Sequence, residues 1–153
     1  MDVLHFVNVF SAGIAAGIQI AVLAAVLPAL ERLRPGPSLA LHKAILDHGA
    51  HRFVLVSPPG IALVCALAII VVEGDLTGDV QTWLWLGMLG VAGVAITTFG
   101  FNARINAELR DWPEEDVPAE YSQARRRWDR VHALRTTSGW LAFGCFVAAA
   151  LAR

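Results

Sequence analysis

Four apolar stretches make up most of this sequence, and each is long enough to cross a lipid bilayer as a helix. A transmembrane helix needs about 20 predominantly apolar residues. The chain is 56% hydrophobic and only 16% charged over its 153 residues, which is more apolar than an ordinary soluble domain. The sequence therefore predicts a single domain over residues 1–153, an all-α integral membrane protein folded as an antiparallel four-helix transmembrane bundle. The expected spans are residues 3–30, 53–72, 80–101 and 136–151.

The first stretch is expected to remain in the protein as a helix. It follows Met1 and Asp2 without a basic residue, and its apolar run is longer than the core of a signal peptide. Gly13 and Gly17 stand four residues apart inside it, a spacing that lets another helix approach closely. We expect this strip to pack within the chain. The alternative is a homo-oligomer that forms through Gly13 and Gly17.

The positions of the basic residues predict the orientation in the membrane. Of the 12 lysines and arginines, all but Arg153 lie in the two segments 31–52 and 102–135. Because basic connecting segments stay in the cytoplasm, we expect a multi-pass protein of the cytoplasmic membrane with both termini outside. The formal net charge is −1, so no overall basic field points to a nucleic-acid partner.

The two basic segments are predicted to be helical extensions below the membrane. Ser38 is a candidate N-cap after two prolines, and the helix it opens would continue through His48 and His51 and bend at residues 57–60. The third helix is expected to extend to about Arg110. The fourth is expected to start near Pro118 and to run for about 30 residues.

Several functional classes are disfavoured by residues that the sequence lacks. Cys65 and Cys145 stand alone in apolar stretches, which argues against a zinc ribbon, a disulfide framework or a quinone-linked thiol oxidase. The expected hydrocarbon interior contains no carboxylate, lysine or arginine, whereas a proton-driven exporter needs an ionisable group at mid-membrane. Its polar residues are Asn8, Ser11, Gln19, Thr97 and Thr98.

Polar residues just below the expected inner membrane face form three sets with helical spacing. Because residues three, four and seven apart share a helix face, these sets would converge in an antiparallel bundle and form a polar pocket beneath an apolar roof. Each set also has a purely structural interpretation: asparagines that bond across helices, an interfacial tryptophan, and a surface ion pair. The sets are Trp128 with His132 and Arg135, Asn102 with Asn106, and Asp47 with His51.

The second half of the chain resembles a known family. Residues 99–112 contain N-x-x-x-N followed by Trp112, and residues 128–135 read W-x-x-x-H-x-x-R before the last apolar helix. This combination is similar to the anthrone oxygenase family of small four-helix membrane proteins. The first half agrees in outline, through Leu27-Pro28 and through Asp47 and His51-Arg52 ahead of Pro58.

The resemblance implies an oxygenase that converts an anthrone into an anthraquinone with molecular oxygen. On this hypothesis His51 or His132 removes a proton from the substrate. Two asparagines and one arginine then stabilise the resulting enolate oxygen. Trp128 would stack on the rings, and Asp47 would contribute to substrate binding. The expected partners are the lipid bilayer and a hydrophobic aromatic small molecule. The stabilising set is Asn102, Asn106 and Arg135.

The cofactor is left open by the sequence, although none is favoured. His48, His51 and His132 could supply imidazole ligands to iron, copper or haem, but their spacing matches no recognised metal motif. His5 and His42 are expected to be uninvolved. The rival interpretation is a non-catalytic accessory subunit or a lipid- or haem-binding scaffold, for which the run Arg125–Arg127 would provide lipid contacts.

Overall fold

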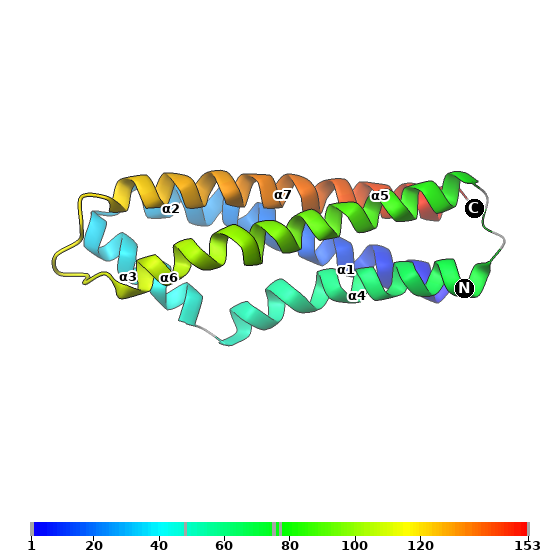
Figure 1. Ribbon diagram of the computed structural model, residues 1–153, viewed down its shortest axis with the longest axis horizontal. Helices are drawn as coiled ribbons and strands as arrows, with labels where there is room; N and C mark the ends of the chain where they lie inside the picture. The colour runs from blue at the N-terminus through cyan, green and yellow to red at the C-terminus, as the bar shows by residue number, and fades with distance from the viewer. Residues whose placement is uncertain (1, 48, 75, 77, 153) are drawn as a thin grey trace.

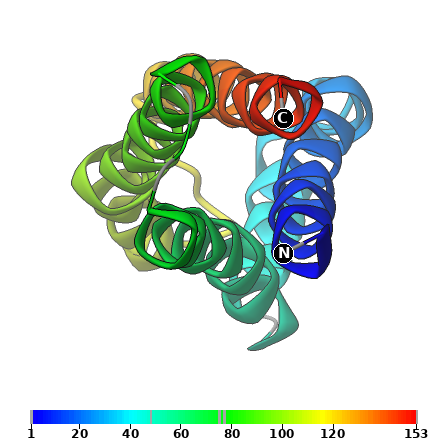
Figure 2. The same ribbon diagram turned by 90° about the vertical axis from the view of Figure 1, so that its right-hand side faces the viewer.

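Four helical rods lie side by side in the structure, a computed structural model that describes residues 2–47, 49–74, 76 and 78–152, with side chains described except at residues 2 and 49–55. No strand occurs in these ranges. Figure 1 shows both termini at one end of the molecule, and Figure 2 shows the rods arranged around a four-sided cross-section. The prediction of an antiparallel all-α four-helix bundle is confirmed.

The first and third rods are each continuous, and each contains a π-helical segment. The first comprises α1 (Asp2–Ala21), the π segment η1 (Val22–Val26) and α2 (Leu27–Glu31). The third comprises α5 (Gly78–Ala95), the π segment η2 (Ile96–Asn102) and α6 (Ala103–Asp111). The extension of the third helix past Phe101 is confirmed. It ends where Trp112 adopts an extended backbone with ψ of 138°.

The second rod comprises two described helices, and the predicted continuation between them falls on His48, which lies outside the described residues. These are α3 (Pro35–Asp47) and α4 (Gly49–Glu73). Ser38 is not the N-cap: its backbone N–H already bonds to the carbonyl of Arg34, and the helix starts at Pro35, where a missing N–H costs nothing. α4 continues through Pro58 and Pro59.

The fourth rod is the single helix α7 (Tyr121–Leu151), 31 residues long as expected. It packs closely against α5 because glycines line the contact. A Cβ added at Gly90 would lie 2.8 Å from the Cβ of Ala142, and one added at Gly93 would lie 2.9 Å from the Oγ of Ser138. Small residues at such a contact allow helix axes to approach closely in a membrane protein.

The Gly13 and Gly17 strip is used only in part. A Cβ at Gly13 would lie 3.2 Å from the ring of Phe143, whereas nothing lies within 4 Å of one at Gly17. Gly13 therefore packs within the chain, as expected. An oligomer interface that uses both glycines would have to form beside the existing contact between Gly13 and Phe143 of α7.

The outer surface of the bundle is apolar, as membrane contact requires. Four helices are long and apolar enough to span a bilayer: Val3–Glu31, Val56–Glu73, Gly78–Asp111 and Tyr121–Leu151. Large side chains such as Phe6, Val71 and Leu89 are more than half exposed, so the chain is a multi-pass membrane protein. The core between the helices contains Ala62, Ile69, Leu84, Phe146 and their neighbours.

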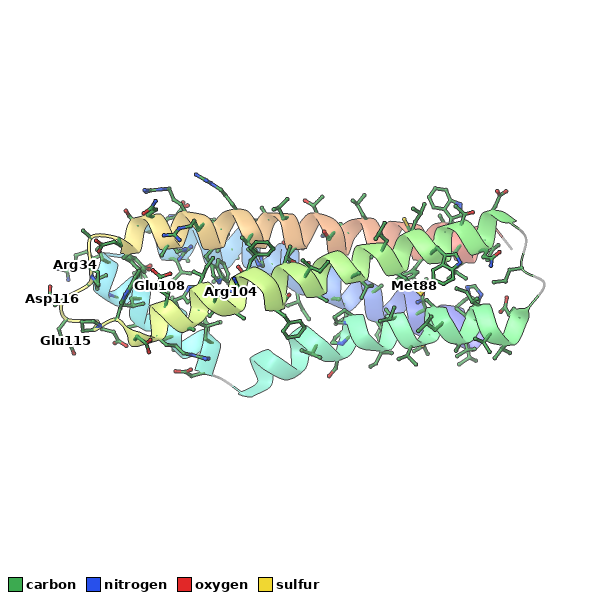
Figure 3. All side chains as sticks on the ribbon, viewed as in Figure 1. Arg34, Met88, Arg104, Glu108, Glu115 and Asp116 are labelled. Carbon is green, nitrogen blue, oxygen red and sulfur yellow. The ribbon has the colours of Figure 1, made fainter. Side chains whose placement is uncertain are left out.

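Charged side chains gather at the end of the bundle opposite the termini. Figure 3 labels Arg34, Glu115 and Asp116 there, whereas Met88 lies in the apolar half. A small second core fixes this end, built from Leu39, Leu109, Tyr121 and Ala124.

Candidate functional site

His132 of α7 lies at the centre of a buried polar cluster, and both of its ring nitrogens are engaged. The side chain is fully buried. Nη2 of Arg135 lies 2.5 Å from Nδ1, and the backbone carbonyl of Gln19 lies 3.1 Å from Nε2. Because a guanidinium can only donate, Nδ1 must accept. The proton of the imidazole is therefore assigned to Nε2, which donates to Gln19, and the ring is neutral.

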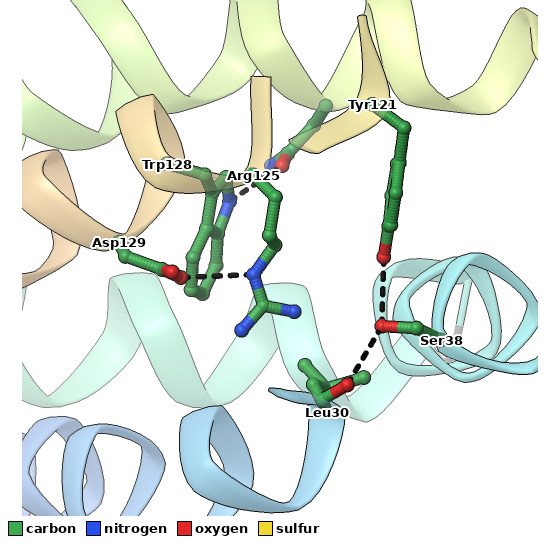
Figure 4. Close-up of polar contacts among 7 residues, drawn as sticks. Leu30, Ser38, Tyr121, Arg125, Trp128 and Asp129 are labelled. Atoms are coloured by element: carbon green, nitrogen blue, oxygen red, sulfur yellow. Dashed lines mark hydrogen bonds and ion pairs between the residues drawn. The ribbon is translucent and has the colours of Figure 1, made fainter. Parts of the chain in front are cut away.

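Trp128, one turn before His132, fixes the position of the imidazole. The two rings stack with centroids 5.1 Å apart and planes 5° from parallel. The indole N–H of Trp128 donates to Oδ1 of Asn106 over 2.8 Å, a bond drawn in Figure 4. The imidazole of His42 meets the indole edge-on, with centroids 5.0 Å apart. Trp128 thus joins α3, α6 and α7.

Asn102 lies at the level of His132 and is almost completely buried, with 1% exposure. Its level follows from the antiparallel register: Asn106 bonds to Trp128, and Asn102 and His132 each lie four residues farther toward the other end of the bundle. In the part of the chain that the structure describes, neither atom of its amide has a hydrogen-bond partner. Such a group is costly to bury.

Arg135 carries a buried charge with no counter-ion among the described residues. It is 4% exposed, its Nε has no hydrogen-bond partner there, and it forms none of the ion pairs found in that part of the chain. Oε1 of Gln19 also lacks a partner in the same residues. Buried charges are ordinarily paired, so this cluster has unused capacity to bind a polar or anionic ligand.

A small cavity of about 40 Å³ adjoins the cluster. It can hold about three water molecules but not an aromatic ring system, so a larger ligand would have to widen it. Val22 and Val26 come from η1, and π-helical turns are frequent at functional sites. The lining residues are Val22, Val26, Leu30, His42, Ile45, Leu46, Trp128 and Arg135.

A second polar layer supports the cluster from the charged end. The hydroxyl of Tyr121 donates to Oγ of Ser38 over 2.7 Å, and Ser38 donates to the carbonyl of Leu30 over 3.1 Å. Arg125 bonds through Nε to Asp129 at 2.9 Å. Figure 4 shows these contacts linking α2, α3 and α7. They hold α3, and with it His42, against the cluster.

The structure brings together four of the residues that the sequence selected and buries a fifth at their level. Trp128, His132 and Arg135 are in contact along α7, as their spacing predicts. Asn106 bonds to that stripe, and Asn102 is buried at its level.

Asp47 lies apart from these residues. Its side chain is 65% exposed and pairs with Arg110 at 3.2 Å. The expected Asp47–His51 pair involves a side chain outside the described residues, so it stays a prediction. His48 and the side chain of His51 lie outside the described residues.

Two contributors were missed by the sequence analysis. His42 was expected to be uninvolved, yet it is buried against Trp128. Its signal was the four-residue spacing of Ser38, His42 and Leu46, which are all buried in α3. Gln19 was noted only as a polar residue of the membrane interior, and its backbone carbonyl carries the contact with His132.

The described residues contain no group of three or more histidine, cysteine or acidic side chains that could hold a metal ion. His132 would have to release Arg135 or Gln19 to become a ligand, because both of its nitrogens are engaged. His48 and His51 lie outside this test, so a metal bound through these histidines stays a prediction.

Comparison with known families matches a model described as anthrone oxygenase to residues 48–145, about two thirds of the chain. The chain belongs to the anthrone oxygenase family. The matched range contains the five clustered candidates and excludes Gln19 and His42. Membership suggests that this family member is an oxygenase. No curated protein and no solved structure matches the chain.

Proposed function

We propose that this protein is a membrane-embedded oxygenase that acts on a hydrophobic, anthrone-like substrate with molecular oxygen at the cluster around His132. The observation that carries the proposal is the buried guanidinium of Arg135, which has no carboxylate partner among the described residues and bonds to a neutral imidazole. Such a cation is suited to an anion that forms only during the reaction. An enolate or phenolate oxygen is an anion of this kind.

His132 supplies the base in this proposal. Its lone pair is on Nδ1 and is held by Arg135, so a bound substrate would replace that hydrogen bond. Nδ1 then takes a proton from the acidic methylene or phenol, and Arg135 turns toward the substrate oxygen that becomes negative. The Nε2–H bond to the carbonyl of Gln19 keeps the ring in the required tautomer and stabilises the imidazolium that forms.

The remaining residues have distinct roles. The unpartnered amide of Asn102 donates to the enolate oxygen, because its N–H groups are buried and unused within the described residues. Asn106 acts through Trp128, since its Oδ1 already accepts the indole N–H, and is a positioning residue. Trp128 offers the substrate an aromatic surface for stacking once the cavity widens. Asp47, exposed and paired with Arg110, has no assigned part in this step.

The overall reaction balances with oxygen as the only oxidant. The carbanion formed by proton removal donates an electron to O₂, and the two radicals combine into a peroxide anion at the former methylene carbon. This anion takes the proton back from the imidazolium of His132 and becomes a hydroperoxide. Loss of the remaining hydrogen on that carbon, with cleavage of the O–O bond, releases water and leaves a ketone. One anthrone and one O₂ thus give one anthraquinone and one water.

The location of the site suits a substrate dissolved in the bilayer. Counted back from Leu151, about 20 residues of α7 at 1.5 Å each cover the hydrocarbon layer and end near His132. The cluster would lie at one boundary of the membrane. The charge distribution in the sequence supports a cytoplasmic location for this boundary, with both termini outside.

The deciding experiment measures oxygen uptake and anthraquinone formation by the full chain in mild detergent, with anthrone as substrate. We expect His132→Ala to abolish turnover above the rate of the protein-free control. Arg126→Ala, an exposed change on the same helix, should retain it. Full activity of folded His132→Ala would overturn the assignment of the base.

Inactivity of the unsubstituted protein toward anthrone would instead favour the scaffold interpretation. An absorption spectrum and elemental analysis of the same preparation test the alternative of a metal or haem. Iron or copper that is lost in the His132 variant would move the proposal to metal-dependent oxidation.

A further inference from the structure

A groove of about 370 Å³ runs between the third rod and α7. The charged residues that line it are Arg104 and Glu108 of α6 with Arg127 and Arg130 of α7; its apolar residues are Gly100, Phe101, Ile105 and Val131. Figure 3 labels Arg104 and Glu108 on the part of α6 that runs beside α7. None of these residues belongs to the cluster around His132.

The groove has an excess of positive charge that is not neutralised. Three guanidinium groups face one carboxylate. Within the described residues, no acidic side chain lies within 4.0 Å of the guanidinium nitrogens of Arg104, Arg127 or Arg130. A second groove on α7 differs in this respect. There Arg125 and Arg126 are matched by Glu31 and Asp129, and Arg125 is bound to Asp129.

The depth of the groove corresponds to the lipid headgroups. If the hydrocarbon layer ends near His132, as counted from Leu151, Arg130 and Arg127 lie within about 8 Å below this boundary. The headgroup region on each side of a bilayer is about 5–8 Å thick. The three guanidinium groups would therefore lie at the level of the phosphates.

The opposite end of the groove is apolar and leads into the hydrocarbon region. Gly100, Phe101 and Val131 line this end, and a Cβ at Gly100 would meet nothing within 4 Å. Phe101 is 54% exposed, and its neighbour Phe99 is 63% exposed. The groove thus offers cations to a headgroup and an aromatic wall to the first part of an acyl chain.

We infer that this groove is a binding site for one anionic phospholipid. The phosphate is held by Arg104, Arg127 and Arg130, and the acyl chain lies along Phe101. Arginine suits this role because its planar guanidinium bonds to two phosphate oxygens at once. The inference is independent of the proposed oxygenase activity, because it uses no residue of the cluster.

The test counts bound lipids on the full chain in detergent by native mass spectrometry and titrates phosphatidylglycerol against phosphatidylcholine. The groove variant replaces Arg104, Arg127 and Arg130 by glutamine. The matched control replaces Arg32, Arg34 and Arg126, which are exposed and line no part of this groove. We expect the groove variant to bind phosphatidylglycerol at least about tenfold more weakly, and the control to bind it as the unsubstituted chain does.

Equal losses in both triple variants would reduce the effect to surface charge and overturn the inference. Equal affinity for phosphatidylcholine would do the same, because the headgroup charge would not matter. Inorganic phosphate serves as a competitor, and displacement of the lipid at equal concentrations would assign the site to a free phosphate instead. Arg127→Gln alone, with circular dichroism as a folding check, repeats the test if the triple variant does not fold.

Discussion

Arg135 donates a hydrogen bond from Nη2 to Nδ1 of His132 over 2.5 Å, so a buried cation is hydrogen-bonded to a neutral ring. A guanidinium in this setting loses its hydration without gaining a carboxylate among the described residues. That arrangement is expensive for folding. It becomes favourable when a negatively charged oxygen forms beside it, and this expectation leads to the first prediction.

Arg135→Met should separate stability from activity. Methionine fills similar space without a charge, so the thermal unfolding temperature in detergent should stay unchanged or rise. Turnover of anthrone should fall about 10²- to 10³-fold, because the stabilising charge is gone. Arg126→Met, exposed on the same helix, is the control and should change neither quantity. A large loss of stability with unaltered turnover would show that Arg135 serves the fold.

Asn102→Leu is expected to give the same separation at the level of His132. The amide is buried and makes no hydrogen bond within the described residues, so leucine, which has the same branching without polar atoms, removes a desolvation cost of about 1 kcal/mol or more. We therefore expect equal or higher stability and about 10- to 100-fold lower kcat. Thermal unfolding and oxygen uptake on one preparation measure both. A destabilised variant would reveal a partner for Asn102.

The Trp128–Asn106 bond should be measurable as a coupling energy. Trp128→Phe removes the indole N–H, and Asn106→Leu removes the acceptor that it meets at 2.8 Å. A double-mutant cycle on the free energy of unfolding should give about 0.5–1.5 kcal/mol. Both single variants should also lose activity, because Trp128 stacks on His132. Additive effects would indicate that the bond contributes nothing.

Glycine-to-alanine changes should have opposite effects at Gly90, which lies against α7, and at Gly17, where an added Cβ would have free space. A Cβ at Gly90 would lie 2.8 Å from the Cβ of Ala142 and 2.9 Å from the carbonyl of Ser138, whereas one at Gly17 meets nothing within 4 Å. Gly90→Ala should therefore destabilise the protein by about 1–3 kcal/mol. Gly17→Ala should be neutral or stabilising, because alanine favours helix. Reversible unfolding in mixed micelles measures both.

Much of the fold follows from the sequence because a membrane helix is specified by length and hydropathy alone. The rods built on residues 2–31, 78–111 and 121–151 match their apolar stretches and helical extensions. The predicted continuation through His48 falls outside the described residues, and Pro58 and Pro59 do not end α4. The π segments were missed. A π turn adds one residue to a helical turn, and an apolar stretch gives no sign of that extra residue.

The site was predictable where side-chain spacing determines contact. Trp128, His132 and Arg135 share a face of one uninterrupted helix, and the spacing was sufficient to place them together. Asp47 lies apart from them because its exposed side chain pairs with Arg110, a contact between distant segments that helical spacing does not reveal. His42 was overlooked because its place beside Trp128 depends on how α3 crosses the bundle. That crossing is set by the Tyr121–Ser38 bond between distant segments.

The contact between His132 and Gln19 has a consequence for how this site can vary. The acceptor is a main-chain carbonyl, so any amino acid at position 19 that keeps the helix preserves the bond. Replacement of the Gln19 side chain tests its packing against Gly139 and its unpartnered Oε1, but not this bond. An alanine scan would therefore miss one of the two groups that hold the imidazole. The bond depends on the backbone path of the first rod and not on the residue type at position 19. Sequence variation at position 19 would therefore not reveal the bond.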